Sequence, residues 1–372
     1  MAERRSDKKS TARGKGSTAS TRRAVRSAVK TARRSPLIAL IAVIAVLAAF
    51  AVWYFAEYNP GESVTATTAP PNIVSGTVTT APSEVVSGTA TTAPPKVVSG
   101  TVEVHMIDVG QGDAILVRTD AGDMLIDTGD RTSDSKNNLK KYLSDHHVTE
   151  LEWLVLTHPD ADHIGGAVEV INACRIRRVL LSDCTNSSKT YTDTISAIIE
   201  SEAEVFIVET DDSLETDETV TATVWTAGQT FSLGDADFKI FGPITNPTNN
   251  NNASVVMRMT YGASSILFTG DMEDEANNEI ADVVSAYGDE LRSDILKVGH
   301  HGSRNANNEA LISAVKPKIA IISCGEGNKY GHPHAETITL LEKIGAEIHR
   351  TDLEGDIVYR TNGTEWSRVG GM

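Results

Sequence analysis

The chain has 372 residues, of which 50 are acidic and 34 are basic, so its formal net charge is −16. This length suits one large domain with appendages better than two full domains. The three cysteines are too few and too widely spaced for a cysteine-based zinc site, although Cys174 and Cys184 could form an extracellular disulfide.

The first 35 residues carry twelve Lys/Arg against two acidic side chains and almost no large apolar residue. Such a composition cannot bury a core, so we expect residues 1–35 to be a disordered basic tail in the cytoplasm. Residues 36–56 follow without a charge over 21 positions. A helix of that length spans about 30 Å, the thickness of a bilayer core.

The apolar segment is therefore predicted to be a single transmembrane helix. The basic residues before it place the N-terminus in the cytoplasm, and Trp53 and Tyr54 at its far end suit the membrane interface. We expect a cell-membrane protein whose remaining chain is extracellular. A cleavable signal peptide is the alternative, because Ala49-Phe-Ala51 resembles a cleavage site.

Residues 57–100 contain a twelve-residue repeat, which begins at Thr65, Thr77 and Thr89 and reads TATTAPPNIVSG, TVTTAPSEVVSG and TATTAPPKVVSG. Threonine, serine and proline without Leu or Phe cannot make a packed core and keep a chain extended. A small β-solenoid is the alternative, but three such repeats offer little apolar surface for stacking. We expect a linker between the membrane and a domain of residues 101–372.

Strands and helices alternate along this domain. Apolar runs and alternating patterns predict strands at 102–109, 114–118, 124–127, 151–156, 179–181, 205–208, 238–241, 254–260, 264–269, 295–298, 319–323 and 357–360. Helical periodicity predicts helices at 136–146, 164–173, 192–200, 274–287, 307–315 and 335–344. The alternation predicts an α/β domain whose sheets carry helices on their outer faces.

One stretch, LVLTHPDADHIGG from Leu154 to Gly166, runs from an apolar strand into a turn crowded with potential metal ligands. These are His158, Asp160, Asp162 and His163. Divalent metals such as Zn²⁺ accept mixed histidine and aspartate ligands. The alternative, a polar turn in which Asp162 caps a helix near Ile164, explains only one of the four residues. The stretch therefore predicts a metal site.

The order His-x-Asp-x-Asp-His-x-Gly-Gly resembles the signature of the metallo-β-lactamase superfamily, with Asp160 in place of its usual second histidine. It is similar to the ComEC-like branch, named for the hydrolase domain of a competence channel protein. Four other segments fit this branch: HMIDVGQGD from His105, LIDTGD from Leu125, FTGD from Phe268 and KVGHHGS from Lys297. The resemblance covers roughly residues 102–360. It implies an αβ/βα sandwich with a metal site at one edge between the sheets.

The resemblance also implies that Asp271, after the strand predicted at 264–269, bridges two metal ions, and a helix cap is the alternative. His300 and His301 follow another predicted strand. Because adjacent residues of a strand point to opposite sides, we expect only one of the two to face the metals. His301 is the expected catalytic residue, and His300 the supporting one.

Further residues are assigned more narrowly. His332 is expected to complete the second ion's ligands, with His334 as the alternative. Asp127 in LIDTGD is expected to orient ligands rather than to bind metal, as the resemblance implies. The run Asn249–Asn252 is expected to be a loop, of which Asn251 or Asn252 could touch substrate.

We expect two divalent ions, Zn²⁺ or Mn²⁺, as cofactors. The superfamily's usual third histidine motif has no counterpart, since no histidine occurs from residue 164 to 299. Asp160 could offset this by supplying an oxygen ligand, which also makes Mn²⁺ more acceptable. Metal-activated water, with His301 protonating the leaving oxygen, predicts phosphoester hydrolysis. A lactone or β-lactam hydrolase, or a scaffold that keeps a degenerate site, is the alternative.

Charge bears on the substrate. Residues 101–372 carry 21 Lys/Arg against 45 Asp/Glu, a net charge of −24. Because affinity for DNA depends on neutralising phosphates with basic groups, this balance argues against nucleic acid as the partner. We expect a small phosphoester or a cell-envelope substrate, with a DNA-processing nuclease related to competence proteins as the alternative.

Overall fold

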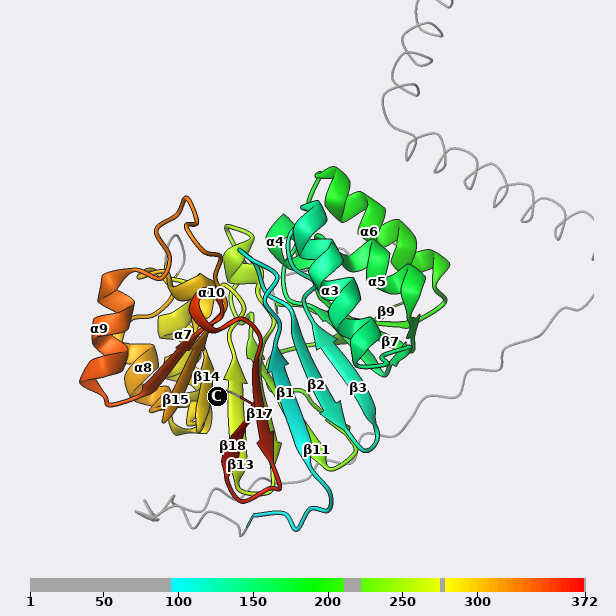
Figure 1. The fold of residues 1–372 in the computed structure, drawn as a ribbon. Coiled ribbons are helices and arrows are strands. Elements are labelled where there is room, and N and C mark those ends of the chain that lie inside the picture. Colours follow the sequence, from blue (N-terminus) through cyan, green and yellow to red (C-terminus); the bar gives the residue numbers. More distant parts are fainter. Residues whose placement is uncertain (1–94, 211–221, 275–277, 371–372) are drawn as a thin grey trace, which may run out of the picture. The chain divides into compact units, whose positions relative to one another are not determined.

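The computed structural model describes residues 95–210, 222–274 and 278–370 (Figure 1). The predicted basic tail, the predicted transmembrane helix at 36–56 and most of the repeat linker lie outside these ranges. Within the described ranges, no helix combines the length and the apolar composition needed to cross a bilayer.

Two large mixed sheets form the centre of the described domain. The first sheet has the strand order β18 (Trp366–Val369), β17 (Ile357–Thr361), β1 (Val102–Met106), β2 (Ile115–Thr119), β3 (Gly122–Ile126), β5 (Trp153–Leu156), β7 (Arg178–Ser182), β8 (Glu204–Val208) and β9 (Ala222–Trp225). The second has the order β10 (Thr230–Leu233), β11 (Ala236–Gly242), β12 (Val256–Tyr261), β13 (Ser264–Phe268), β14 (Ile295–Lys297), β15 (Ile319–Ile322) and β16 (Glu347–Arg350). Strands β4 (Glu150–Leu151) and β6 (Arg175–Ile176) pair separately.

Helices cover the outer faces of both sheets, as Figure 1 shows. Those of the first half are α3 (Ser133–Asp145), α4 (Ala161–Ile164), α5 (Ala167–Ala173) and α6 (Lys189–Glu200). Those of the second half are α7 (Glu279–Tyr287), α8 (Glu309–Val315), α9 (Ala335–Lys343) and the short α10 (Thr351–Glu354). Within the described ranges there are also three 3₁₀ turns: η1 (Asn251–Ala253), η2 (Gly288–Leu291) and η3 (Gly299–Gly302).

Alternation along single strands shows how the layers are built. In β5, Val155 belongs to the core between the sheets, whereas Leu154 packs in the core beneath α3, α5 and α6. In β13, Ile266 faces the core between the sheets, whereas Leu267 packs in the core beneath α7, α8 and α9. Because both faces of each strand are buried, the sequence reads as continuous apolar runs. The domain is an αβ/βα sandwich, as the resemblance implied.

Parallel pairing places the candidate ligands at one edge. Strands β3, β5 and β7 are parallel neighbours in the first sheet, and β13, β14 and β15 in the second. The carboxyl ends of parallel strands meet at the same edge of a sheet. The segment after β5 therefore leaves at the carboxyl edge of the parallel strands of the first sheet, and the segments after β13 and β14 leave at the corresponding edge of the second.

Most predicted elements are present, with shifted boundaries. The helix predicted at 164–173 is divided into α4 and α5 by Gly165 and Gly166. Gly165 lies against the preceding loop so closely that a Cβ there would stand 2.1 Å from the backbone nitrogen of Arg131. The strand predicted at 102–109 ends at Met106, and residues 107–109 continue as a loop in which Ile107 and Val109 are buried. Strands β9, β10, β16 and β18 were not predicted, because their burial is irregular and partly exposed.

The disulfide considered between Cys174 and Cys184 is not formed, and both thiols are free. Cys174 is buried, and its Sγ lies 3.5 Å from the carbonyl oxygen of Val148. Cys184 is half-buried, with its Sγ 3.6 Å from Asn250 Oδ1. The two thiols therefore have different surroundings, and neither serves the other as partner.

Candidate metal centre

The loop after β5 carries the first group of predicted ligands, His158, Asp160, Asp162 and His163. Helix α4 begins one residue before Asp162, so this carboxylate lies within the helix and does not cap one near Ile164. The N-cap position belongs to Asp160, whose side chain makes no capping hydrogen bond. Helix capping therefore does not explain the acidic pair.

The second group of predicted ligands comes from the other sheet. Asp271 follows β13, and His300 and His301 lie in η3 after β14. Both histidines have left-handed backbone angles, with φ of 46° and 52°. In this turn both imidazoles approach one carboxylate, with Nε2 of His300 and of His301 lying 3.7 Å and 3.6 Å from Asp271 Oδ2. The expectation that only one would face the ligands assumed an extended backbone, which this turn does not have.

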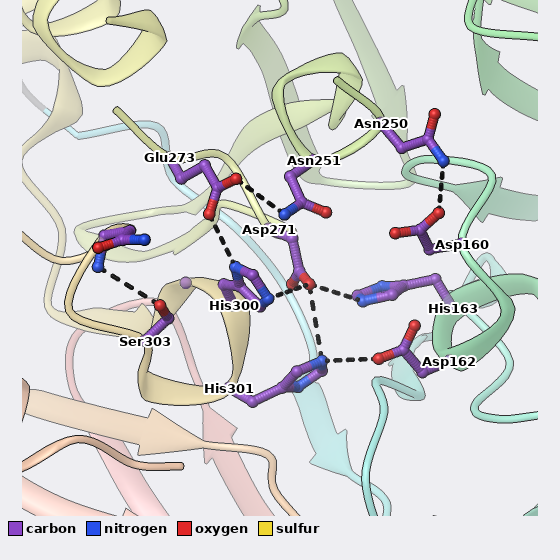
Figure 2. A network of polar contacts seen from close by, with 12 residues as sticks. Asp160, Asp162, His163, Asn250, Asn251, Asp271, Glu273, His300, His301 and Ser303 are labelled. Carbon is purple, nitrogen blue, oxygen red and sulfur yellow. Dashed lines mark hydrogen bonds and ion pairs between the residues drawn. The ribbon is translucent and has the colours of Figure 1, made fainter. Parts of the chain in front are cut away.

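Ligand atoms from the two sheets meet in a single cluster (Figure 2). Among the described residues, four overlapping groups of three have ligand atoms within 4.8 Å of one another. The groups are His158, His163 and Asp271; Asp162, His163 and His301; Asp113, Asp271 and His301; and Asp113, Asp127 and His163. Two separate parts of the sequence therefore converge at one point between the sheets.

Five buried atoms of this cluster make no hydrogen bond among the described residues: His158 Nε2, His163 Nε2, His301 Nε2, Asp113 Oδ1 and Asp271 Oδ1. Two of these nitrogens lie at ion-pair distance from carboxylates, with His163 Nε2 3.2 Å from Asp271 Oδ2 and His301 Nε2 3.4 Å from Asp162 Oδ2. Leaving one buried polar atom unpaired costs about 1–3 kcal/mol. A divalent cation would give these nitrogen and oxygen atoms a common partner. Imidazole nitrogen and carboxylate oxygen form a donor set that Zn²⁺ and Mn²⁺ accept. The residues present therefore fit a metal centre.

The raised pKa values of the buried imidazoles also support a metal centre. Burial opposes protonation of His301, but the carboxylates of Asp271 and Asp113 outweigh burial and raise its pKa to about 10. Burial likewise opposes protonation of His163, and Asp271 and Asp127 raise its pKa well above the usual value. The carboxylates thus draw positive charge onto the imidazoles. A bound cation would replace those protons, because metal and protons compete for the same nitrogens.

Neighbouring groups fix the orientation of these imidazoles. Asp127 Oδ2 lies 2.7 Å from His163 Nδ1, and the same carboxylate accepts hydrogen bonds from Thr157 N at 2.8 Å and Thr157 Oγ1 at 2.7 Å. Ser254 Oγ lies 3.3 Å from His158 Nδ1. With Nδ1 engaged, each ring presents Nε2 to the cluster. Asp127 contacts His163 as expected of a residue that orients a ligand, and its role beside a metal stays a prediction.

Two residues of the site were not assigned from the sequence. Asp113 Oδ1 lies 3.4 Å from His301 Nδ1, which also contacts the carbonyl oxygen of Ser323 at 3.0 Å. Behind Asp113, Lys297 Nζ pairs with its other oxygen. Burial alone would raise the pKa of Asp113, but Lys297, His301 and His163 together outweigh burial and lower it to about 2. Both residues stand in the quoted segments GQGD and KVGHHGS, but spacing alone does not bring them together.

The asparagine run is also part of the site. Asn250 Nδ2 donates to Asp160 Oδ1 at 2.6 Å, and Asn251 Nδ2 donates to Glu273 Oε1 at 2.9 Å (Figure 2). Glu273 Oε2 in turn lies 3.0 Å from His300 Nδ1. The sequence offered one hint of Glu273, its place two positions after Asp271.

Two predicted ligands lie at the margin of the cluster. Asp160 Oδ2 lies 3.9 Å from His158 Nε2, and its side chain is 38 % exposed. The His332 ring is centred 5.4 Å from that of His300 and 4.8 Å from that of His334. Neither Asp160 nor His332 belongs to the four groups among the described residues. Their ligand roles stay predictions.

Known proteins resemble this chain in sequence. The chain is 32 % identical over 275 residues to ComE operon protein 3 of Bacillus subtilis, an alignment that covers 69 % of this chain and 33 % of the relative. It is 29 % identical over 259 residues to Recombination protein 2 of Haemophilus influenzae, covering 68 % of this chain and 28 % of the relative. The chain thus spans about a third of the length of these curated relatives.

Among solved structures, a diphosphatase from the PhnP family is 15 % identical, with a TM-score of 0.36, and the match covers 67 % of this chain and 94 % of that one. The family model described as the metallo-beta-lactamase superfamily matches residues 107–326. The curated relatives match the ComEC-like branch to which the sequence motifs were similar. The chain belongs to the metallo-β-lactamase superfamily.

Proposed function

We propose that this superfamily hydrolase is a metal-dependent phosphoesterase. The observation that carries the proposal is the convergence of three imidazole nitrogens and two carboxylate oxygens that make no hydrogen bond among the described residues, at a buried point between the sheets. Buried polar atoms of a purely structural cluster are normally paired with one another or with the backbone. Unpaired ligand atoms from two sheets therefore support a site built for a cation.

In this proposal two divalent ions, Zn²⁺ or Mn²⁺, are held by His158, Asp162, His163, Asp271 and His301, with Asp160 and His332 as further ligands. Ions of this kind lower the pKa of a bound water towards about 7 and hold an anionic oxygen. His301 Nε2 lies within the ligand cluster. One nitrogen cannot bind an ion and donate a proton together, so His301 is assigned as a ligand here rather than as the proton donor expected from the sequence.

The proposed substrate is a small phosphoester or a phosphoester of the cell envelope. The net charge of −24 on residues 101–372 supports this choice, because that charge repels a long polyanion while a metal centre can still hold one phosphate. The second candidate is a DNA-processing nuclease. It is favoured by the names of two curated relatives, Recombination protein 2 and Competence protein ComA of Neisseria gonorrhoeae.

The assay uses the full chain in detergent, with small phosphodiesters and single-stranded DNA compared at low and physiological salt. We expect turnover of the small diesters, its loss after chelation and its return with Zn²⁺ or Mn²⁺. Hydrolysis that survives complete removal of metal would contradict the metal-dependent mechanism. Efficient DNA cleavage at low salt, with affinity falling as salt rises, would favour the nuclease.

We further propose that residues 36–56 anchor the chain in the cell membrane with the hydrolase domain outside. The support is the uncharged apolar segment and the basic residues before it. Protease added to intact cells should remove the domain and spare the basic tail. Protection of the domain, or a mature protein that begins near Val52, would contradict this topology.

A further inference from the structure

The asparagine run encloses a buried carboxylate. Glu273 is 3 % exposed, and its Oε1 accepts hydrogen bonds from Asn251 Nδ2 at 2.9 Å and Asn249 Nδ2 at 3.2 Å. Its backbone nitrogen donates to Asn252 Oδ1 at 2.9 Å. Two amide donors on one oxygen hold the carboxylate in place and leave Oε2 for another partner.

That partner is His300. Glu273 Oε2 lies 3.0 Å from His300 Nδ1, and Figure 2 shows the imidazole between Glu273 and Asp271. A carboxylate on Nδ1 fixes both the tautomer and the ring orientation of a histidine. At the opposite end of the ring, Nε2 lies 3.7 Å from Asp271 Oδ2. The ring is therefore aimed at the candidate metal centre from the side opposite Glu273.

His300 differs from the other imidazoles of the centre in exposure. Its side chain is 24 % exposed, whereas those of His158 and His163 are 0 % exposed and that of His301 is 1 % exposed. Among the described residues, His300 also belongs to none of the four ligand groups. It is thus the imidazole beside Asp271 that a substrate can reach from solvent.

We propose that Glu273, held by Asn249 and Asn251, is a positioning residue that aims His300 at the leaving oxygen of a bound phosphoester. The inference rests on the proposed phosphoesterase function. In the step, a bond forms between a water oxygen and phosphorus, and the bond from phosphorus to the leaving oxygen breaks. His300 enters the step as an imidazolium, with its Nδ1 proton hydrogen-bonded to Glu273 and its Nε2 proton facing the leaving oxygen. The leaving oxygen takes the Nε2 proton, and the proton released by the attacking water restores the imidazolium through solvent.

This assignment explains why asparagine occupies positions 249 and 251. An aspartate at position 249 or 251 would bring a second carboxylate against Glu273, and an apolar residue would leave Oε1 with one donor fewer. Either change would loosen the carboxylate that holds His300. Many polar residue types would satisfy a turn, but an asparagine amide also donates to Glu273 and adds no charge.

The test compares two phosphodiesters that share one group and differ in the leaving alcohol, a p-nitrophenol and a simple alkyl alcohol. A weakly acidic alcohol needs a proton as it departs, whereas p-nitrophenolate leaves without one. We expect His300→Gln and Glu273→Gln in the full-length chain to lower kcat on the alkyl ester by roughly 100-fold or more, the usual scale of general acid catalysis. On the p-nitrophenyl ester the loss should be a few-fold at most.

Three measurements separate positioning from damage to the fold or the centre. Metal content and melting temperature should match those of wild type in both variants. The double variant should lose little more than either single one, because both changes remove the same proton transfer. Glu279→Gln is the matched control, since Glu279 is also a buried glutamate but its carboxylate accepts from Ile244 N at 2.7 Å instead of facing an imidazole.

If Glu273→Gln fails to fold, Asn251→Ala replaces it and should give the same dependence on the leaving group at smaller amplitude. Equal losses on both esters, or loss of metal from the His300 variant, would overturn the inference while leaving the phosphoesterase standing. A metal-loaded wild type that hydrolyses neither ester nor any other phosphoester would overturn the proposed function and this inference together.

Discussion

Lys297 and Asp113 form an ion pair that is closed off from solvent directly behind the candidate metal ligands, with side chains 1 % and 2 % exposed. Asp113 also lies 3.4 Å from His301 Nδ1, so the pair belongs to the same network as the site. Burial lowers the pKa of Lys297, but Asp113 and Asp271 outweigh burial and raise it. The ammonium group therefore supplies permanent positive charge among clustered carboxylates.

Removing this ammonium should be costly. Lys297→Met keeps the length of the side chain but leaves Asp113 as a buried charge without its partner, and we expect a loss of about 3–5 kcal/mol in the free energy of unfolding. Urea unfolding of the metal-free variant and wild type measures this loss in the free energy of unfolding. Lys318→Met is the control, because Lys318 pairs with Asp294 at 2.9 Å but is 79 % exposed, and it should cost at most about 1 kcal/mol. Similar losses in both variants would contradict the prediction.

Gly112→Ala should lower metal affinity. Gly112 has φ of +148°, and a Cβ there would stand 2.5 Å from the backbone oxygen of Asp162, so the loop carrying that ligand must shift. We expect roughly tenfold weaker metal binding or more, by titration with Zn²⁺. Gly110→Ala is the matched control, since Gly110 has φ of +75° but a Cβ would meet nothing within 4 Å. It should lose stability from backbone strain and keep normal metal affinity.

Metal should stabilise the folded chain through Asp271. Asp271 Oδ1 is one of the unpaired buried atoms, and its side chain is 3 % exposed. At a Zn²⁺ concentration 100 times the dissociation constant, one site adds about 2.7 kcal/mol. Asp271→Asn should hold less metal by elemental analysis and gain less in melting temperature on adding Zn²⁺, whereas Asp282→Asn on the exposed face of α7 should behave as wild type. Unchanged metal content in Asp271→Asn would remove this carboxylate from the centre.

His105 should make stability depend on pH independently of the metal. It is 2 % exposed, its Nδ1 lies 2.7 Å from the hydroxyl of Tyr142, and burial lowers its pKa to about 4. The unfolded chain, with a histidine pKa of about 6.5, binds more protons between these values. The contribution of neutral His105 to the free energy of unfolding is therefore complete above pH 6.5. This contribution falls by about 3 kcal/mol as pH falls towards 4.

Urea unfolding of metal-free wild type and His105→Gln at pH 7.5, 5.5 and 4.5 checks this prediction. The difference in unfolding free energy between the two proteins isolates His105 from other titrating groups. That difference should shrink or change sign as pH falls. A difference that stays constant over the range would show that His105 does not control this pH dependence.

Sequence patterns predicted the elements whose burial is regular. Strands such as β5 and β13 are buried on both faces, so their apolar runs stand out, whereas β9 and β18 at the sheet edges mix exposed and partly buried positions. The ligand-rich turn from His158 to His163 was predicted because all of its chemistry lies within six residues. Expectations for residues 1–94 lie outside the described ranges and stay predictions.

Contacts across the fold could not be predicted in the same way. Asp113 meets Lys297, and Asn251 meets Glu273, only because two sheets bring distant loops together. Alternation along a strand gave His300 and His301 opposite directions, and the consecutive left-handed angles that turn both towards Asp271 leave no mark in the residue pattern. Backbone angles and long-range neighbours are set by packing, which a local pattern does not encode.

The pairing of β1 with β17 has a consequence for how the chain reaches its native state. Glu103 and Arg360 lie 257 positions apart and form a hydrogen bond across this pair. Strand β1, at the start of the domain, therefore cannot pair with β17 until the end of the domain has been synthesised. A growing chain would meanwhile expose an open strand edge, which is the usual starting point of aggregation. Such distant pairing also slows folding. The domain should therefore need its complete length before its first sheet closes, and truncations near the C-terminus should reduce the yield of soluble protein out of proportion to the few residues removed.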